Sequence, residues 1–345
     1  MISRLGLIRT PVVSSKRFLS VATQSSTPNT SNSPIDLHPS FHLDDIPDLP
    51  FEERVILPYK QYKPYSNHID QTLTPILMVH GLFGNKSNYN VVGREISRIT
   101  KHPVYGVDLR NHGDAPHVLP HTYSQLASDL HDFIMDRHWK SVILVGHSMG
   151  AKASMILSLL YPELIEKLVV VDNTPHYKPL SKQYEWDLLG MCEVEEKHPD
   201  VKDAEGKRVV DVKKVERMLS KYEPDPVVRQ FLMQNLLTKP GHHKFSMAKN
   251  PHKEVFKTPV MNFYKHGIVP SLGGWPNIGS ADKYLKPVLV LSGKKSEFVL
   301  PEYYYEFDRY FDDVEYEEFD CGHWISSEKP KEFVEAISKF VTESS

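Results

Sequence analysis

Short apolar runs alternate with amphipathic segments along most of the chain. Residues 75–81 (PILMVHG) and 141–146 (SVILVG) are continuous apolar runs that end in glycine, as fully buried parallel strands do. Residues 87–100 and 122–138 instead place apolar side chains at helical spacing. Strands that alternate with helices in this way predict an α/β fold with a mostly parallel, doubly wound sheet.

The same alternation extends over two separate parts of the chain. Further strands are predicted at 54–59 (an edge strand), 103–110, 167–172, 287–293 and 314–319, and further helices at 150–162, 301–311 and from about 330. Charge-rich and Pro/Gly-rich stretches interrupt the pattern between them, with one predicted helix at 227–236. We therefore expect a core made of residues 46–175 and 286–345, with a mostly helical lid inserted at 176–285.

The N-terminal segment differs in composition from the rest. Residues 1–22 contain four basic residues, many hydroxyl side chains and no acidic residue. This composition is typical of a mitochondrial transit peptide, so we expect the protein in the mitochondrion; a disordered basic tail is the alternative. Residues 23–45 are rich in Ser, Thr, Asn and Pro and are predicted to be a disordered linker.

Charge and cysteine content exclude several classes of function. The net charge of −3 gives no electrostatic reason to expect a nucleic acid or an anionic membrane surface as partner. Cys192 and Cys321 are the only cysteines, which rules out a disulfide framework, and the 18 histidines show no metal-ligand spacing. No apolar run is long enough for a transmembrane segment. We therefore predict neither a metal nor a cofactor.

The strongest chemical signal is the pentapeptide Gly146-His147-Ser148-Met149-Gly150. It lies between a predicted buried strand and a predicted helix, where a sharp turn would present the Ser148 hydroxyl above the sheet. A Cβ at either flanking glycine would clash in such a turn. Ser148 is therefore the predicted nucleophile of a serine-dependent enzyme.

A base and oxyanion donors are found at the positions that this architecture requires. His323 follows the last predicted strand in "DCGHWISSEKP" and is the predicted base. The backbone N–H groups of Met149 and Leu82 are the predicted oxyanion hole, since Leu82 lies in the loop "HGLFG" after an earlier strand. His80 in the same loop is expected to hold the loop by a hydrogen bond rather than to react.

Two carboxylates compete for the role of the acid that orients the base. Glu297 is the only carboxylate just after the strand 287–293, where such an acid usually lies. Asp172 ends the preceding strand at the same edge of the sheet and can reach the same imidazole, because a triad is defined by geometry rather than by position. We favour Asp172 and keep Glu297 as the alternative acid.

The assembled motifs resemble those of the α/β-hydrolase superfamily. "HGLFGNKSNY", "DLRNHG", "GHSMGAK", "VVVDNTP", "SGKKSEFV" and "GHW" are similar to one subgroup over roughly residues 50–342. This subgroup comprises YbfF-like esterases, mitochondrial abhydrolases and yeast mitochondrial ethanol (alcohol) acetyltransferases. The resemblance implies Ser148 as nucleophile, Asp172 as acid and His323 as base. One departure is Ala151, where glycine is more common; alanine is tolerated in a helix.

Three functions follow from the resemblance and the triad. The first is an alcohol acetyltransferase that makes acetate esters such as ethyl acetate from acetyl-CoA and a short alcohol, with thioesterase and esterase side activity. The second is a carboxylesterase or lipid ester hydrolase, and the third a non-catalytic binding protein on a hydrolase fold. Because no Gly-rich nucleotide-binding loop is present, acetyl-CoA would be bound as a substrate by the lid. Lys152 is expected to be an exposed helix residue.

Overall fold

The computed structural model describes residues 46–65, 68–202, 206, 208–237, 254–278 and 282–343. The predicted transit peptide and linker lie outside these residues. Within the described part of the chain, no helix has the length and apolarity needed to span a bilayer.

The core is a mostly parallel sheet, as the hydrophobic pattern predicts. Its seven strands lie in the order β1-β3-β2-β4-β5-β8-β9. Only β1 is antiparallel to its neighbour; the other pairs are parallel. The strands are β1 (Tyr59–Gln61), β2 (Ile76–Val79), β3 (Val104–Val107), β4 (Val142–His147), β5 (Ile165–Val171), β8 (Val288–Gly293) and β9 (Val314–Phe319). The helices that accompany them are α1 (Asn90–Thr100), α2 (Tyr123–Asp136), α3 (Met149–Leu160), α9 (Tyr304–Asp308), α10 (Ile325–Glu328) and α11 (Pro330–Thr342).

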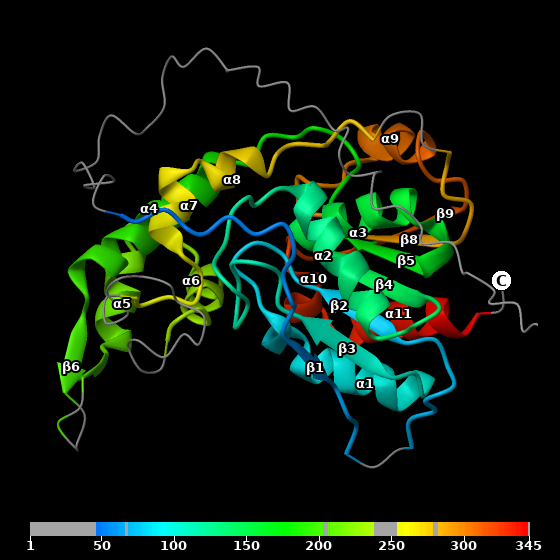
Figure 1. Cartoon of the computed structure of the whole chain (residues 1–345), viewed down its shortest axis with the longest axis horizontal. Helices are drawn as coiled ribbons and strands as arrows, with labels where there is room; N and C mark the ends of the chain where they lie inside the picture. The colour runs from blue at the N-terminus through cyan, green and yellow to red at the C-terminus, as the bar shows by residue number, and fades with distance from the viewer. Residues whose placement is uncertain are drawn as a thin grey trace, which may run out of the picture. The chain divides into compact units, whose positions relative to one another are not determined.

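Both faces of the sheet are covered, which makes the fold doubly wound (Figure 1). In β4, Leu144 faces one apolar cluster while Ile143 and Val145 face the other, because successive side chains of a strand point to opposite faces. Helices α2 and α3 contribute to the first cluster, and α1 and α11 to the second. The continuous apolar pattern of the strands is explained by this two-sided burial.

The predicted edge strand at 54–59 is wrong in its position, because the strand forms only at Tyr59–Gln61. The backbone N–H of Val55 donates to the Asp129 carboxylate at 3.2 Å instead of to a neighbouring strand. Val55 and Leu57 are nonetheless buried, so their apolar character reflects packing rather than sheet pairing.

Between β5 and β8 the chain forms the predicted helical lid. Its elements are α4 (Lys182–Lys197), the hairpin β6 (Asp200–Lys202) and β7 (Arg208–Val210), α5 (Val212–Leu219), α6 (Pro226–Met233), α7 (Val260–Lys265) and α8 (Ile268–Ser271). The helix predicted at 227–236 is α6. Figure 1 shows these elements grouped beside the sheet.

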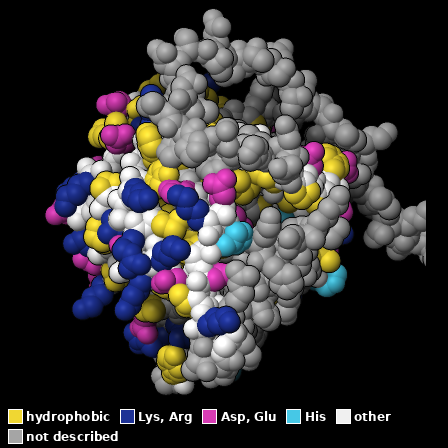
Figure 2. Space-filling model, turned by 90° about the vertical axis from the view of Figure 1, so that its left-hand side faces the viewer, with side chains coloured by type: hydrophobic (Ala, Val, Ile, Leu, Met, Phe, Trp, Pro, Cys, Tyr) yellow, Lys and Arg dark blue, Asp and Glu magenta, His cyan; other side chains and the backbone are white. Residues whose placement is uncertain are grey.

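The outer face of the lid is charged. Figure 2 views the molecule from the side of α5 and β6 and shows Lys and Arg side chains gathered there. On α5, Lys213, Lys214 and Arg217 are exposed, while Val215 and Leu219 on the opposite side are buried. This amphipathic pattern directs the apolar side of α5 into the protein and its basic side into solvent.

The expectation that Lys152 is an exposed helix residue is wrong, because Lys152 is only 1% exposed. Its Nζ donates to the backbone carbonyls of His176 at 3.1 Å, Gly273 at 3.0 Å and Gly274 at 2.9 Å. Burial lowers the pKa of Lys152 to about 7, and the three carbonyls oppose this because they accept hydrogen bonds from the ammonium. Lys152 thus ties α3, the helix after Ser148, to the lid.

Substituting Lys152→Met should lower the free energy of unfolding by about 2–4 kcal/mol, because one buried and two half-buried carbonyls would lose their donor. Urea denaturation followed by circular dichroism measures this change. The control is Lys140→Met, an exposed lysine, which should stay within about 0.5 kcal/mol of the unsubstituted protein. Equal stability of the two variants would contradict a structural role for the Lys152 hydrogen bonds.

Candidate active site

Ser148 occupies the sharp turn between β4 and α3, as its flanking sequence predicts. Its backbone has φ 54° and ψ −117°, a strained conformation for a residue with a side chain. A Cβ at Gly146 would lie 2.5 Å from Ser154 Oγ, and one at Gly150 would lie 2.5 Å from the His80 carbonyl oxygen. The two glycines therefore allow the close approach that this turn requires.

Asp172 and His323 form a direct hydrogen bond. Asp172 follows β5 and is fully buried, and its Oδ2 lies 2.6 Å from His323 Nδ1. A carboxylate can only accept, so Nδ1 donates and the lone pair is left on Nε2. The backbone brings Ser148 to the same edge of the sheet, because its N–H donates to the carbonyl of Val171 at 2.9 Å.

Two further donors hold the Asp172 carboxylate. The Ser296 hydroxyl donates to Oδ2 at 2.5 Å, and the Gly293 N–H donates to Oδ1 at 3.2 Å. The sequence analysis does not predict Ser296, although Ser296 directly precedes Glu297. The available signal is a hydroxyl side chain close to the end of β8.

Glu297, the alternative acid, does not contact His323. Its side chain is exposed, and its backbone carbonyl accepts a hydrogen bond from Lys178 Nζ. The structure thus brings Asp172, rather than Glu297, to the imidazole.

The loop after β2 is held in place by His80. His80 Nε2 accepts from the Leu109 N–H at 3.0 Å, and Nδ1 lies 2.8 Å from the Gly81 carbonyl oxygen. Burial lowers the pKa of His80 to about 4, which keeps the ring neutral, as these two bonds require. Leu82, the predicted oxyanion donor, lies in this loop. Met149, the other, is the first residue of α3, so its N–H has no intrahelical acceptor.

Aromatic rings surround the His323 imidazole. Phe298 stacks on it with a centroid distance of 4.3 Å, and His147 lies at 4.7 Å. Burial, together with the neighbouring His323, lowers the pKa of His147 to about 3. A neutral His147, with Nε2 2.9 Å from the His323 carbonyl oxygen, supports the loop and does not compete as a base at neutral pH.

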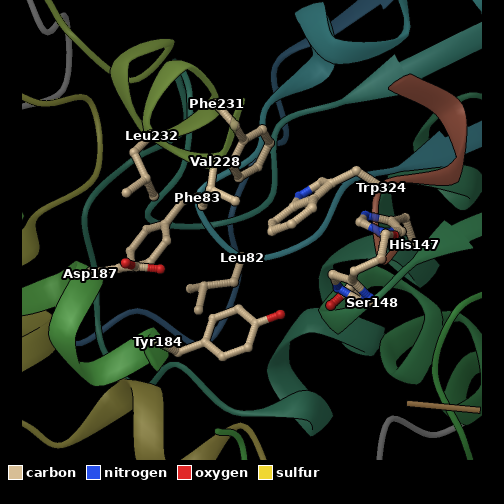
Figure 3. Close-up of a pocket in the computed structure, with 11 residues that line it drawn as sticks. Leu82, Phe83, His147, Ser148, Tyr184, Asp187, Val228, Phe231, Leu232 and Trp324 are labelled. Atoms are coloured by element: carbon tan, nitrogen blue, oxygen red, sulfur yellow. The ribbon is translucent and has the colours of Figure 1, made fainter. Parts of the chain in front are cut away.

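Ser148 and His323 line one pocket of about 330 Å³, part of which is open to solvent (Figure 3). The lining residues are Leu82, Phe83, His147, Ser148, Tyr184, Asp187, Val228, Phe231, Leu232, His323 and Trp324. Most of them are apolar, and the lid helices α4 and α6 supply five. The described residues contain no hydrogen bond between the Ser148 hydroxyl and His323; such bonds often tighten only when substrate binds.

Metal ligands are not grouped in the described part of the chain. No cluster of three or more His, Cys, Asp or Glu side chains there could hold a metal ion. Cys192 and Cys321 are both buried and free.

Comparisons with known proteins connect this geometry to a family. The family described as alpha/beta hydrolase fold matches residues 74–189. An abhydrolase domain-containing protein of Schizosaccharomyces pombe is 34% identical over 77% of this chain and 92% of its own length. Ethanol acetyltransferase 1 of Cyberlindnera jadinii is 31% identical over 85% of this chain and 88% of its own. The solved structure of a marine microorganism esterase has a TM-score of 0.66 at 24% identity, covering 83% of this chain and 99% of that one.

Proposed function

The chain belongs to the α/β-hydrolase family, and on that premise we propose that it transfers acyl groups through an acyl-Ser148 intermediate. The specific proposal is transfer of acetyl from acetyl-CoA to a short alcohol such as ethanol, with hydrolysis of esters and thioesters as a side activity. The observation that carries the proposal is the buried Asp172–His323 hydrogen bond, together with the pocket that His323 and Ser148 both line.

Acylation begins when Ser148 Oγ attacks the carbonyl carbon of the donor while His323 Nε2 takes its proton. Asp172 keeps the imidazole in the tautomer with Nδ1–H and stabilises the imidazolium that forms. When the tetrahedral intermediate collapses, the bond to the leaving group breaks, and His323 returns the proton to the departing thiol or alcohol. The acyl group then remains on Ser148 as an ester.

Deacylation repeats these steps with a second nucleophile. His323 removes the proton of an incoming alcohol, whose oxygen attacks the acyl-Ser148 carbonyl, and the same proton returns to Ser148 Oγ as the product ester leaves. In both half-reactions, the N–H groups of Met149 and Leu82 are proposed to bind the oxyanion. Removal of one such donor typically costs about 10²–10³-fold in rate, so this contribution is substantial.

Two features support an alcohol as acceptor. The pocket walls are mainly apolar, so they can pack against the alkyl group of a small alcohol, which water lacks. The ethanol acetyltransferases found among the relatives carry that activity in their names. The alternative is a carboxylesterase or lipid ester hydrolase, because water can attack the same acyl-enzyme.

The proposal is tested by measuring how much of the acetyl group is transferred to ethanol and how much to water. The full-length protein is incubated with acetyl-CoA, with and without ethanol, and ethyl acetate, acetate and free CoA are quantified. We expect ethyl acetate to form only with ethanol and only in protein that retains Ser148. Acetate and CoA without ethyl acetate would overturn the transferase proposal and leave a thioesterase.

We also propose that the protein resides in the mitochondrion. The support is the basic, hydroxyl-rich composition of residues 1–22, which lacks acidic side chains. A reporter fused behind residues 1–45 should enter mitochondria in yeast cells; a cytosolic reporter would contradict the proposal.

A further inference from the structure

Asp187 is the one acidic side chain in the wall of the active-site pocket. It projects from α4 of the lid and is 4% exposed, with Phe83 and Leu232 beside it in the pocket wall. Figure 3 shows Asp187 and Ser148 on opposite sides of the pocket. An acidic group placed among apolar side chains carries a desolvation cost, so its presence needs an explanation.

A second buried carboxyl group lies directly behind Asp187. The Gln183 amide donates to Asp187 Oδ1 at 2.9 Å and to Glu223 Oε2 at 3.1 Å, so one amide nitrogen bridges the two carboxyl groups. Glu223 is 4% exposed and does not line the pocket. No ion pair of the described residues involves Asp187 or Glu223, and the guanidinium of Arg229 pairs with Glu216 instead.

A carboxyl group that is buried beside a second carboxyl group, and that has no cation as partner, is favoured in its protonated form. Burial raises the pKa of Asp187, and the neighbouring Glu223 raises it further. Glu223 Oε1 accepts the Asp225 N–H at 2.6 Å. Asp187 is thus held as a neutral carboxyl group in the pocket wall.

This arrangement presents a neutral carboxyl group to the substrate. The oxygens of a neutral carboxyl group keep free lone pairs, which can accept a further hydrogen bond from the pocket. Such a group offers no charge with which an ammonium or a carboxylate of a substrate could pair. A substrate hydroxyl can hydrogen-bond to Asp187, whereas a plain alkyl chain cannot.

We propose that Asp187 is a specificity-determining residue that binds a hydroxyl group at the far end of a short substrate chain. The substrate class is thus a short ester or thioester with a neutral hydroxyl away from the reacting carbonyl. The hydroxyl can be carried by the acyl chain or by the alcohol. This inference rests on the proposed function of the same pocket.

Matched esters test the inference by comparing kcat/KM in the full-length protein. Ethyl 6-hydroxyhexanoate against ethyl hexanoate places the hydroxyl at the end of the acyl chain, and 4-hydroxybutyl acetate against butyl acetate places it at the end of the alcohol. Acetylcholine and ethyl hydrogen succinate supply a cationic and an anionic group. We expect one hydroxylated ester to exceed its alkyl match by about tenfold to a hundredfold, because a site built around a polar group rejects an analogue that lacks its partner.

Variants connect this preference to Asp187. Asp187→Asn retains a carbonyl oxygen and should keep the preference, whereas Asp187→Leu should remove it and favour the alkyl ester. Leu232→Val, a change of size in the same wall, should affect both members of a pair alike. Thermal melting identifies the variants that fold. The ratio of kcat/KM between the two esters of a pair, measured in the unsubstituted protein, tests the inference even if no variant folds.

Three results would overturn the inference: equal rates for both members of each pair, a preference for the charged esters, or an unchanged preference in folded Asp187→Leu. Turnover of alkyl esters without a hydroxyl preference would leave the proposed function standing while this inference fails. If no ester or thioester reacts at all, the proposed function itself fails, and this inference fails with it.

Discussion

Replacing Ser148 with alanine should lower the turnover of acetyl-CoA by about 10⁴–10⁶-fold, as expected when the nucleophile of a triad is removed. The reason is that the Ser148 oxygen carries the acyl group in the proposed reaction. No other residue of the turn between β4 and α3 has a hydroxyl group that could replace it. Release of free CoA measures the rate, and thermal melting confirms that the variant is folded.

Ser158→Ala is a matched control for this loss. Ser158 lies on the same helix, and its hydroxyl donates to the Met155 carbonyl at 2.8 Å, away from the pocket. The control should retain the rate of the unsubstituted protein. A Ser148→Ala variant as active as the control would show that the acyl group does not pass through Ser148.

Asp172→Asn should lower kcat by about 10⁴-fold, because the amide cannot fix the imidazole in the tautomer with Nδ1–H. Asparagine also changes the charge that Ser296 and Gly293 now stabilise by their hydrogen bonds. Steady-state kinetics with acetyl-CoA, or with an activated acetate ester, measure the loss.

Glu297→Gln serves as the comparison, since Glu297 is the carboxylate that the position after β8 would favour. Its side chain is exposed, and His323 Nδ1 is hydrogen-bonded to Asp172 instead, so the variant should keep full activity. The opposite pattern is an active Asp172→Asn and an inactive Glu297→Gln. It would show that the acid is Glu297 after β8 and not Asp172 after β5.

The sheet could be predicted because its signal is local. A strand buried on both faces must be apolar at every position, and β2, β4 and β5 each show that pattern within a few residues. Ser148 could be predicted for the same reason: strand, glycine-flanked turn and helix are contiguous in the sequence. By contrast, Asp172 and His323 are 151 positions apart, and only the order of the strands brings them together.

Polar residues that act through the lid could not be predicted. Lys152 reads as a surface lysine in its own helix, and its three carbonyl partners come from distant segments. Asp187 lies on α4, where charged and apolar side chains are mixed and no clear apolar stripe shows which side faces the pocket. Burial of a polar side chain depends on tertiary packing, which a local pattern of hydrophobic positions does not contain.

Labelling with a fluorophosphonate probe addresses the acyl-Ser148 intermediate directly, because such probes react with serine hydroxyls that a neighbouring base activates. The full-length protein is treated with the probe, digested and mapped by mass spectrometry. A single adduct on Ser148, absent from Ser148→Ala and strongly reduced in Asp172→Asn, is the expected result. A folded protein that takes up no probe, or takes it up on another residue, would contradict the serine mechanism and favour a non-catalytic binding protein on a hydrolase fold.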